Sequence, residues 1–98
     1  MATYVVTFSF TQQGIQQIKA SPGRVDAAKK IIQDMGGEVK AFYGVLGAEF
    51  DTMFIVEAPG DEAVARMSLA ISALGNVRTS THRAFPEEEY RRIVSGLP

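Results

Sequence analysis

The sequence predicts an α+β fold in which a four-stranded sheet carries helices on one side. Stretches with the composition of strands alternate with stretches of helical periodicity in the order β, α, β, β, α, β, and a terminal helix follows. The chain has 98 residues, of which 46% are hydrophobic and 21% are charged, so we expect a single domain over residues 1–98. This order of elements is that of the split βαβ, or ferredoxin-like, βαββαβ sandwich.

The chain opens with a strand and a short helix. Residues Thr3–Phe10 are rich in β-branched and aromatic side chains, which favours a strand. The hydroxyl of Thr11 is placed to cap a helix start, and the spacing of Ile15 and Ile18 predicts that both face inward. The first strand therefore leads into the helical layer within a few residues.

The second helix has clearer boundaries. Ser21 precedes Pro22, a capping hydroxyl followed by a proline suited to the first helical turn. Gly36 and Gly37 end the helix, because glycine adopts the left-handed conformation at little cost. The predicted inward face repeats at helical spacing and consists of Val25, Ala28, Ile32 and Met35.

A β-hairpin occupies the middle of the chain. We expect strands at Glu38–Leu46 and Phe50–Ala58, joined by a turn that contains Gly44 and Gly47. Asp51 lies at the mouth of the second strand. A carboxylate beside a buried strand needs a partner, since an unpaired buried charge is costly.

The last third of the chain adds a helix, a strand and a terminal helix. Pro59–Asp61 breaks the hairpin strand and caps the third helix, which ends at Gly75–Asn76. Val77–Phe85 has the composition of a strand, and Pro86–Glu89 begins a helix whose first-turn carboxylates suit the helix dipole. The third helix has an inward face of Val64, Met67, Ile71 and Leu74, and the terminal helix has an apolar edge of Tyr90, Ile93, Val94 and Leu97.

Two of the predicted strands are apolar on both faces. In the first strand Val5 points away from the side chains of Tyr4, Val6, Phe8 and Phe10. In Phe50–Ala58, Met53 and Ile55 point away from Phe50, Phe54 and Val56. Helices cover one face only, so we expect a second copy of the chain to cover the other and form a dimeric α+β barrel. The alternative is that the terminal segments fold over the open face.

Composition and motifs exclude several classes of function. A net charge of −1 gives no basic surface for nucleic acid or an anionic membrane. The absence of cysteine excludes thiol chemistry and fits a cytoplasmic location. The N-terminus lacks the features of a signal peptide, and no apolar stretch is long enough to span a bilayer. Neither a phosphate-loop motif nor a metal-ligand cluster occurs, so we expect no metal and no cofactor.

Asp51 and His82 are the first candidates for chemistry. The carboxylate of Asp51 can accept backbone N–H groups of the turn or pair with an arginine, Arg78 or Arg83, and it can also face a ligand as a general base. The structural role is the favoured interpretation. His82, the sole histidine, is either a hydrogen-bonded surface residue or a proton carrier at a cavity.

A polar stripe on the fourth strand supplies further candidates. Thr79, Thr81 and Arg83 share one face of this strand, and a solvated edge strand is the simpler explanation. In the functional alternative these side chains line a pocket, with Arg83 binding an anionic group and Tyr43 adding a phenol from the hairpin. The candidate ligand-binding set is therefore Tyr43, Asp51, Thr81, His82 and Arg83.

The chain resembles the GYD-domain family, a group of largely uncharacterised function in the dimeric α+β barrel class. The matching stretches, in order, are TQQGI at 11–15, KAFY at 40–43, VEAP at 56–59, LGNVRT at 74–79 and RAF at 83–85. The family's namesake motif, roughly Gly-x-Tyr-Asp, corresponds here to Gly47–Asp51, with Phe50 in place of the tyrosine and one additional residue. The resemblance carries the aspartate over to Asp51 but carries over no phenol.

Three functions remain open from the sequence. The first is a homo-oligomer that binds a small molecule between sheet and helices. The second is a cofactor-independent oxygenase or an isomerase-like enzyme, an activity that the barrel class implies by analogy, with His82 or Asp51 as base and Arg83 binding an anion. The third is an assembly or interaction module.

Overall fold

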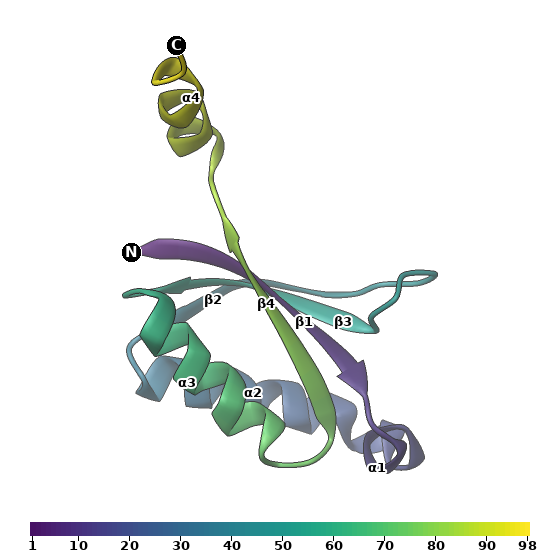
Figure 1. Ribbon diagram of the computed structural model, residues 1–98. Coiled ribbons are helices and arrows are strands. Elements are labelled where there is room, and N and C mark those ends of the chain that lie inside the picture. Colours follow the sequence, from purple (N-terminus) through teal and green to yellow (C-terminus); the bar gives the residue numbers. More distant parts are fainter.

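The computed structural model describes residues 1–98 and has the predicted order of elements (Figure 1). The sheet is antiparallel with strand order β2-β3-β1-β4, so the ferredoxin-like prediction is confirmed. The elements are β1 (Ala2–Phe10), α1 (Gln12–Gln16), the 3-10 turn η1 (Ile18–Ala20), α2 (Ser21–Asp34), β2 (Glu38–Gly44), β3 (Thr52–Ala58), α3 (Asp61–Ser72), β4 (Val77–Ala84) and α4 (Glu87–Ser95).

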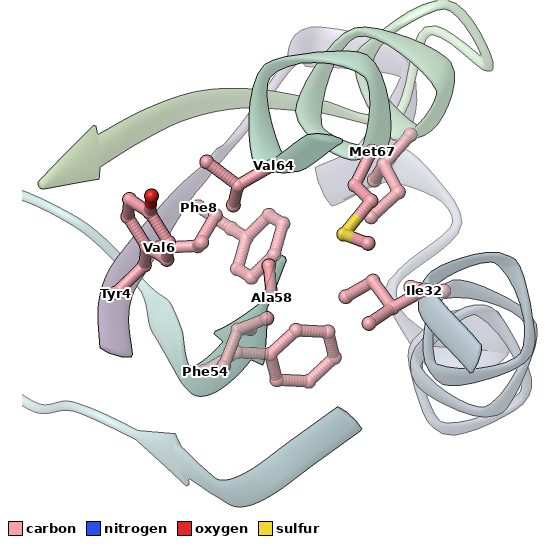
Figure 2. Close-up of a cluster of buried hydrophobic side chains, with 11 residues drawn as sticks. Tyr4, Val6, Phe8, Ile32, Phe54, Ala58, Val64 and Met67 are labelled. Atoms are coloured by element: carbon pink, nitrogen blue, oxygen red, sulfur yellow. The ribbon is translucent and has the colours of Figure 1, made fainter. Parts of the chain in front are cut away.

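The hydrophobic core lies between one face of the sheet and the helices α2 and α3 (Figure 2). At its centre the ring of Phe54 packs edge-on against Phe8, with ring centroids 5.0 Å apart, and against Phe42 at 5.7 Å. The predicted grouping of Tyr4, Val6 and Phe8 on one face of β1 is confirmed, and the structure shows that this face is the buried one. The buried members of this core are Tyr4, Val6, Phe8, Ala28, Ile32, Phe54, Val56, Ala58, Val64, Met67 and Ile71.

The strand β2 reaches the core only because it contains a bulge. Val39 pairs with Val56 and Ala41 with Ile55, so Lys40 is the additional residue. In a regular strand Val39 and Phe42, three residues apart, would point to opposite faces of the sheet, since side chains alternate along a strand. With the bulge, both residues pack against the buried cluster.

The short helix α1 packs through its glycine rather than through its isoleucines. Gly14 is buried, and a Cβ placed on it would lie 2.0 Å from the carbonyl oxygen of Asn76. Ile15 is 48% exposed and Ile18 is 42% exposed, so the prediction that they face inward is wrong. Helical spacing cannot reveal that the backbone itself makes the close approach.

The predicted cap of α2 is wrong, whereas the cap of α3 lies within the predicted segment Pro59–Asp61. Ser21 is the first residue of α2, and the capping position is Ala20, which offers no side-chain bond. The capping position of α3 is Gly60, and the carboxylate of Asp61 accepts from the hydroxyl of Tyr4 instead. At α2 the residue type suits a cap, but Ser21 lies one residue too late in the chain.

The other boundaries differ from the predictions by small amounts. Gly36 ends α2 with a φ of +91°, as predicted. Met35 and Leu74, which were predicted to face inward, lie at or beyond helix ends and are exposed. The hairpin strands are shorter by two residues at their turn, where β2 ends at Gly44 and β3 begins at Thr52.

The terminal helix α4 stands clear of the rest of the molecule, on the side of the sheet away from α2 and α3 (Figure 1). The chain measures 51 × 31 × 17 Å, and its radius of gyration is 14.5 Å. A compact chain of this length is expected near about 13 Å. The alternative in which the terminal segments cover the open sheet face is therefore wrong for α4. None of the helices has the length and apolar character needed to cross a membrane.

Candidate functional site

A small apolar cavity lies between the sheet and the helices. Its volume is about 80 Å³, and 10 of its 14 lining residues are hydrophobic. Phe8, Phe42 and Phe54 form the sheet side, while Ala28 and Ile71 close it from the helices. A cavity of this kind admits a small apolar group and excludes larger, polar molecules.

The charged side chain that lines this cavity, Arg24, forms hydrogen bonds within the protein. Arg24 donates from its guanidinium to the carbonyl oxygens of Gln17, at 2.9 Å, and Gly14, at 3.0 Å. The side-chain oxygen of Asn76 accepts from Gln13 at 3.0 Å. These bonds tie α1 to α2 and to the turn before β4, so they build the wall of the cavity.

The five residues predicted as a ligand site do not come together. Register pairs His82 with Val5 and Tyr43 with Met53, which places both on the sheet face without helices. Thr81 pairs with the core residue Val6, so it lies on the helix face with Arg83. None of the five, Tyr43, Asp51, Thr81, His82 or Arg83, lines the apolar cavity.

Asp51 has a structural role at the end of the hairpin. Its carboxylate accepts from the backbone N–H of Phe10 at 2.9 Å, and its own N–H donates to the carbonyl of Phe8 at 2.8 Å. The N–H of Val45 donates to the Asp51 carbonyl at 2.9 Å. The predicted bond to backbone N–H groups is therefore found, although Phe10 belongs to β1 and not to the turn, and the proposed arginine partners do not contact Asp51.

His82 is an exposed residue with one side-chain neighbour. Its Nε2 atom lies 3.0 Å from the hydroxyl of Ser80, two residues away on the same face of β4. The hydroxyl of Thr7 donates to the carbonyl of Ser80 at 3.3 Å. This arrangement is a surface hydrogen-bonded row and does not border the apolar cavity.

The strand β4 is an edge strand as predicted, but α3 covers Thr79 and Thr81, so the predicted solvated face is wrong for these two residues. The hydroxyl of Thr81 lies 2.8 Å from that of Ser68, and the hydroxyl of Thr79 lies 3.0 Å from that of Ser72. Each pair satisfies two polar groups at a partly buried helix–sheet contact. The threonines therefore help to hold α3 on β4.

A cluster around Tyr4 was missed at the sequence level. The hydroxyl of Tyr4, a residue only 2% exposed, donates to a carboxylate oxygen of Asp61 at 2.5 Å. Burial raises the pKa of Tyr4, and the hydrogen bond and charge of Asp61 raise it further, while the Arg83 charge opposes them. The available signal was the inward position of Tyr4, because a buried phenol usually finds a partner.

Arg83 connects this cluster to the terminal helix. Its guanidinium carbon lies 5.7 Å from the centre of the Tyr4 ring and 4.6 Å from that of Phe85. A nitrogen of the same group lies 3.2 Å from a carboxylate oxygen of Glu89, in α4. The carboxylate of Glu89 therefore balances the charge of Arg83, and the pair links β4 to α4.

The sheet face without helices is apolar at its centre and charged along one margin. Val5, Met53 and Ile55 are partly exposed there, next to the 58% exposed Tyr43. At the margin the ammonium group of Lys40 lies 3.6 Å from Glu57 and 3.5 Å from Glu38. We call this surface, centred on Val5, Met53 and Ile55, the bare sheet face.

Comparison with known families agrees with the geometry. The model of the GYD domain matches residues 4–94. The chain belongs to the GYD-domain family. In this GYD-domain protein the aspartate of the signature region, Asp51, joins the hairpin to β1 through backbone hydrogen bonds.

One relative and one solved structure are informative. A Thermus thermophilus protein named glutamine synthetase and cystathionine beta-lyase binding protein is 33% identical over 87 residues, which cover 88% of this chain and 90% of the relative. The leucine response regulatory protein of Mycobacterium tuberculosis is similar in structure, with a TM-score of 0.64 and 20% identity. That match covers 87% of this chain and 51% of the solved chain, and it supports the fold alone.

Proposed function

We propose that this GYD-domain protein is a homo-oligomeric, cytoplasmic protein-binding domain formed by the whole chain. The observation that carries the proposal is the bare sheet face, an apolar surface that no part of the chain covers. In the proposed assembly the bare sheet faces of two copies pack on each other about a two-fold axis. The result is the dimeric barrel expected from the sequence.

The side chains at the centre of this face favour such a contact. Val5, Met53 and Ile55 project from adjacent strands in paired register, because Val5 lies opposite Ile55 and Thr7 opposite Met53. Burial of a Val, Ile or Met side chain contributes roughly 1.5–3 kcal/mol each when it is complete. The charged margin at Lys40 and Glu57 limits the ways in which two faces can align.

The oligomer is tested with one variant and a matched control. Ile55→Asp places a carboxylate at the centre of the bare sheet face, whereas Leu69→Asp places one on α3, where Leu69 is already 70% exposed. Size-exclusion chromatography with light scattering should show a dimer for the wild type and for Leu69→Asp, and a monomer for Ile55→Asp. A wild-type monomer at micromolar concentration would refute the proposal.

The class of partner is suggested by the Thermus relative, which is named for binding two enzymes. We propose that this chain likewise binds enzymes of amino-acid metabolism. Biolayer interferometry against the glutamine synthetase and the cystathionine β-lyase of the same organism tests this part of the proposal. If neither enzyme binds while the protein is dimeric, the assignment of partners is wrong and the homo-oligomer stands.

A second candidate function is favoured by the apolar cavity: binding of one small aliphatic or aromatic group between sheet and helices. Ala28 lines this cavity and is 7% exposed, so Ala28→Val reduces the space without adding a polar group. Isobutanol should raise the melting temperature of the wild type and should not raise that of Ala28→Val. Equal responses of the two proteins would eliminate the cavity as the binding site. Neither Asp51 nor His82 lines the cavity, so the geometry lends no support to an enzyme there.

A further inference from the structure

We propose that α4 is an exchanged arm, whose apolar face packs against a second copy of this chain seated on the bare sheet face. The inference rests on the proposed homo-oligomer and specifies what holds it together. In a two-fold pair each copy gives its α4 to the other, so the contact occurs twice.

The first step is the apolar face of α4. Three large side chains of α4 recur at positions i, i+3 and i+4, the spacing that places them on one side of a helix, and Leu97 at i+7 follows directly after the helix end. The charged residues of the helix lie outside this stripe. The stripe and its exposed fractions are Tyr90 at 59%, Ile93 at 49%, Val94 at 44% and Leu97 at 67%.

The second step is that α4 cannot be explained as an isolated helix. It has nine residues, and helices shorter than about 12–15 residues are marginal in water without tertiary contacts. Its one ion pair with the rest of the chain is Glu89 with Arg83, at 3.2 Å. An amphipathic helix of this length acquires its stability by burying its apolar side, and its own chain offers no surface there.

The third step is the direction in which α4 is held. Arg83 fixes the start of the helix from two sides, by its ion pair with Glu89 and by its position over the ring of Phe85 at 4.6 Å. The helix extends to the side of the sheet opposite α2 and α3 (Figure 1). This is the side on which the bare sheet face lies and on which a second copy would sit.

The fourth step is a comparison of lengths. A helix of nine residues is about 13 Å long, and two sheets that pack face to face are about 10 Å apart. An arm that rises from the end of β4 therefore reaches the level of the second sheet. A second copy that packs on the bare sheet face therefore also comes into contact with α4.

The fifth step is the area that a stable pair requires. Four strands paired over about seven residues make a sheet about 19 Å wide and about 24 Å long, a footprint of about 450 Å². Stable protein–protein contacts bury about 800 Å² on each partner. Two reciprocal helices add apolar surface to this contact, which favours a second copy as the occupant over an unrelated protein.

Photo-crosslinking in a mixed-isotope dimer tests the exchange directly. A benzoylphenylalanine replaces Val94, and protein labelled with ¹⁵N is mixed with unlabelled protein, unfolded and refolded together. The expected product joins one labelled and one unlabelled peptide. Crosslinks in which both peptides always carry the same isotope would show that α4 contacts its own chain, and would overturn the proposal.

Substitutions on α4 separate this inference from the proposed function. Ile93→Asp lies on the apolar stripe, and Ser95→Asp lies on the other side of the same exposed helix, so neither should unfold the body of the protein. Ile93→Asp should raise the dimer dissociation constant by about tenfold or more, as for a buried interface residue, and Ser95→Asp should leave it unchanged. If Ile55→Asp dissociates the dimer and Ile93→Asp does not, the sheet pairing is correct and the arm is wrong. The arm is also wrong if Ile93→Asp abolishes binding of a partner enzyme while the dimer persists.

Discussion

Replacing Gly14 by alanine should destabilise this protein, although alanine is the better helix former. Gly14 lies in α1, and an added Cβ would lie 2.0 Å from the carbonyl oxygen of Asn76 and 3.0 Å from its carbonyl carbon. Both are backbone atoms, so no side chain can rotate out of the way. The helix has to move from the turn before β4 by more than an ångström to regain an ordinary contact.

The size of the effect follows from three contributions. Gly to Ala in a helix gains up to about 1 kcal/mol. Forcing a carbon into a packed contact costs about 1–3 kcal/mol, and loss of the hydrogen bond from Thr11 N–H to the Asn76 carbonyl costs about 1 kcal/mol. The free energy of unfolding of Gly14→Ala should therefore fall by about 1–3 kcal/mol.

Gly23 is the matched control, because it lies in α2 and has no atom within 4 Å of the position of an added Cβ. Gly23→Ala should raise the free energy of unfolding by about 0.5–1 kcal/mol. Urea titrations at one protein concentration measure both variants, and the concentration is kept constant because oligomers are stabilised by mass action. Equal stabilisation by the two substitutions would refute the explanation of how α1 is held.

Three further predictions concern the hydrogen bonds described above. Because the pKa of Tyr4 lies above its ordinary value of 10.0, the protonated phenol stabilises the fold fully below pH 10, and this contribution is lost as the pH rises through the raised pKa. Wild-type stability in alkaline urea titrations should therefore fall more steeply than that of Tyr4→Phe, and parallel curves would contradict this. Asp51→Ala should cost about 1 kcal/mol by removing the acceptor for Phe10 N–H, whereas Asp51→Asn, which keeps an oxygen, should cost little in the same assay; equal losses would contradict this. Thr81→Val should cost about 1–2 kcal/mol by leaving the Ser68 hydroxyl without its partner, and adding Ser68→Ala should restore most of the loss; a double variant as unstable as Thr81→Val alone would contradict this.

The fold was predictable because the apolar residues recur in the sequence with the period of a strand or of a helix. Tyr4, Val6 and Phe8 were correctly grouped on one face of β1, and the register then shows that this face is the buried one. The errors arose where the backbone, not a side chain, decides the packing. Because Gly14 is buried, Ile15 and Ile18 point to solvent. The pattern of side chains does not predict such a close approach between two stretches of backbone.

The site was less predictable because it depends on contacts between distant parts of the chain. Side-chain parity correctly grouped Thr81 with Arg83, but only the register with β1 shows that this group faces α3. Tyr4 and Asp61 are separated by 57 positions, and the residues around either one do not indicate that the other is its hydrogen-bond partner. Asp51 was correctly favoured as structural, whereas its actual partner, a backbone N–H of β1, depends on the sheet order.

The bulge in β2 has a consequence for how copies of this protein can accumulate. A straight, unpaired outer strand is a template on which further chains can add without limit. The extra residue at Lys40 bends β2 and interrupts its row of backbone donors and acceptors, so this edge is a poor template for growth. Stacking through the face of the sheet ends with two copies, whereas growth through its edges would produce a filament. The irregular strand thus favours an assembly of finite size.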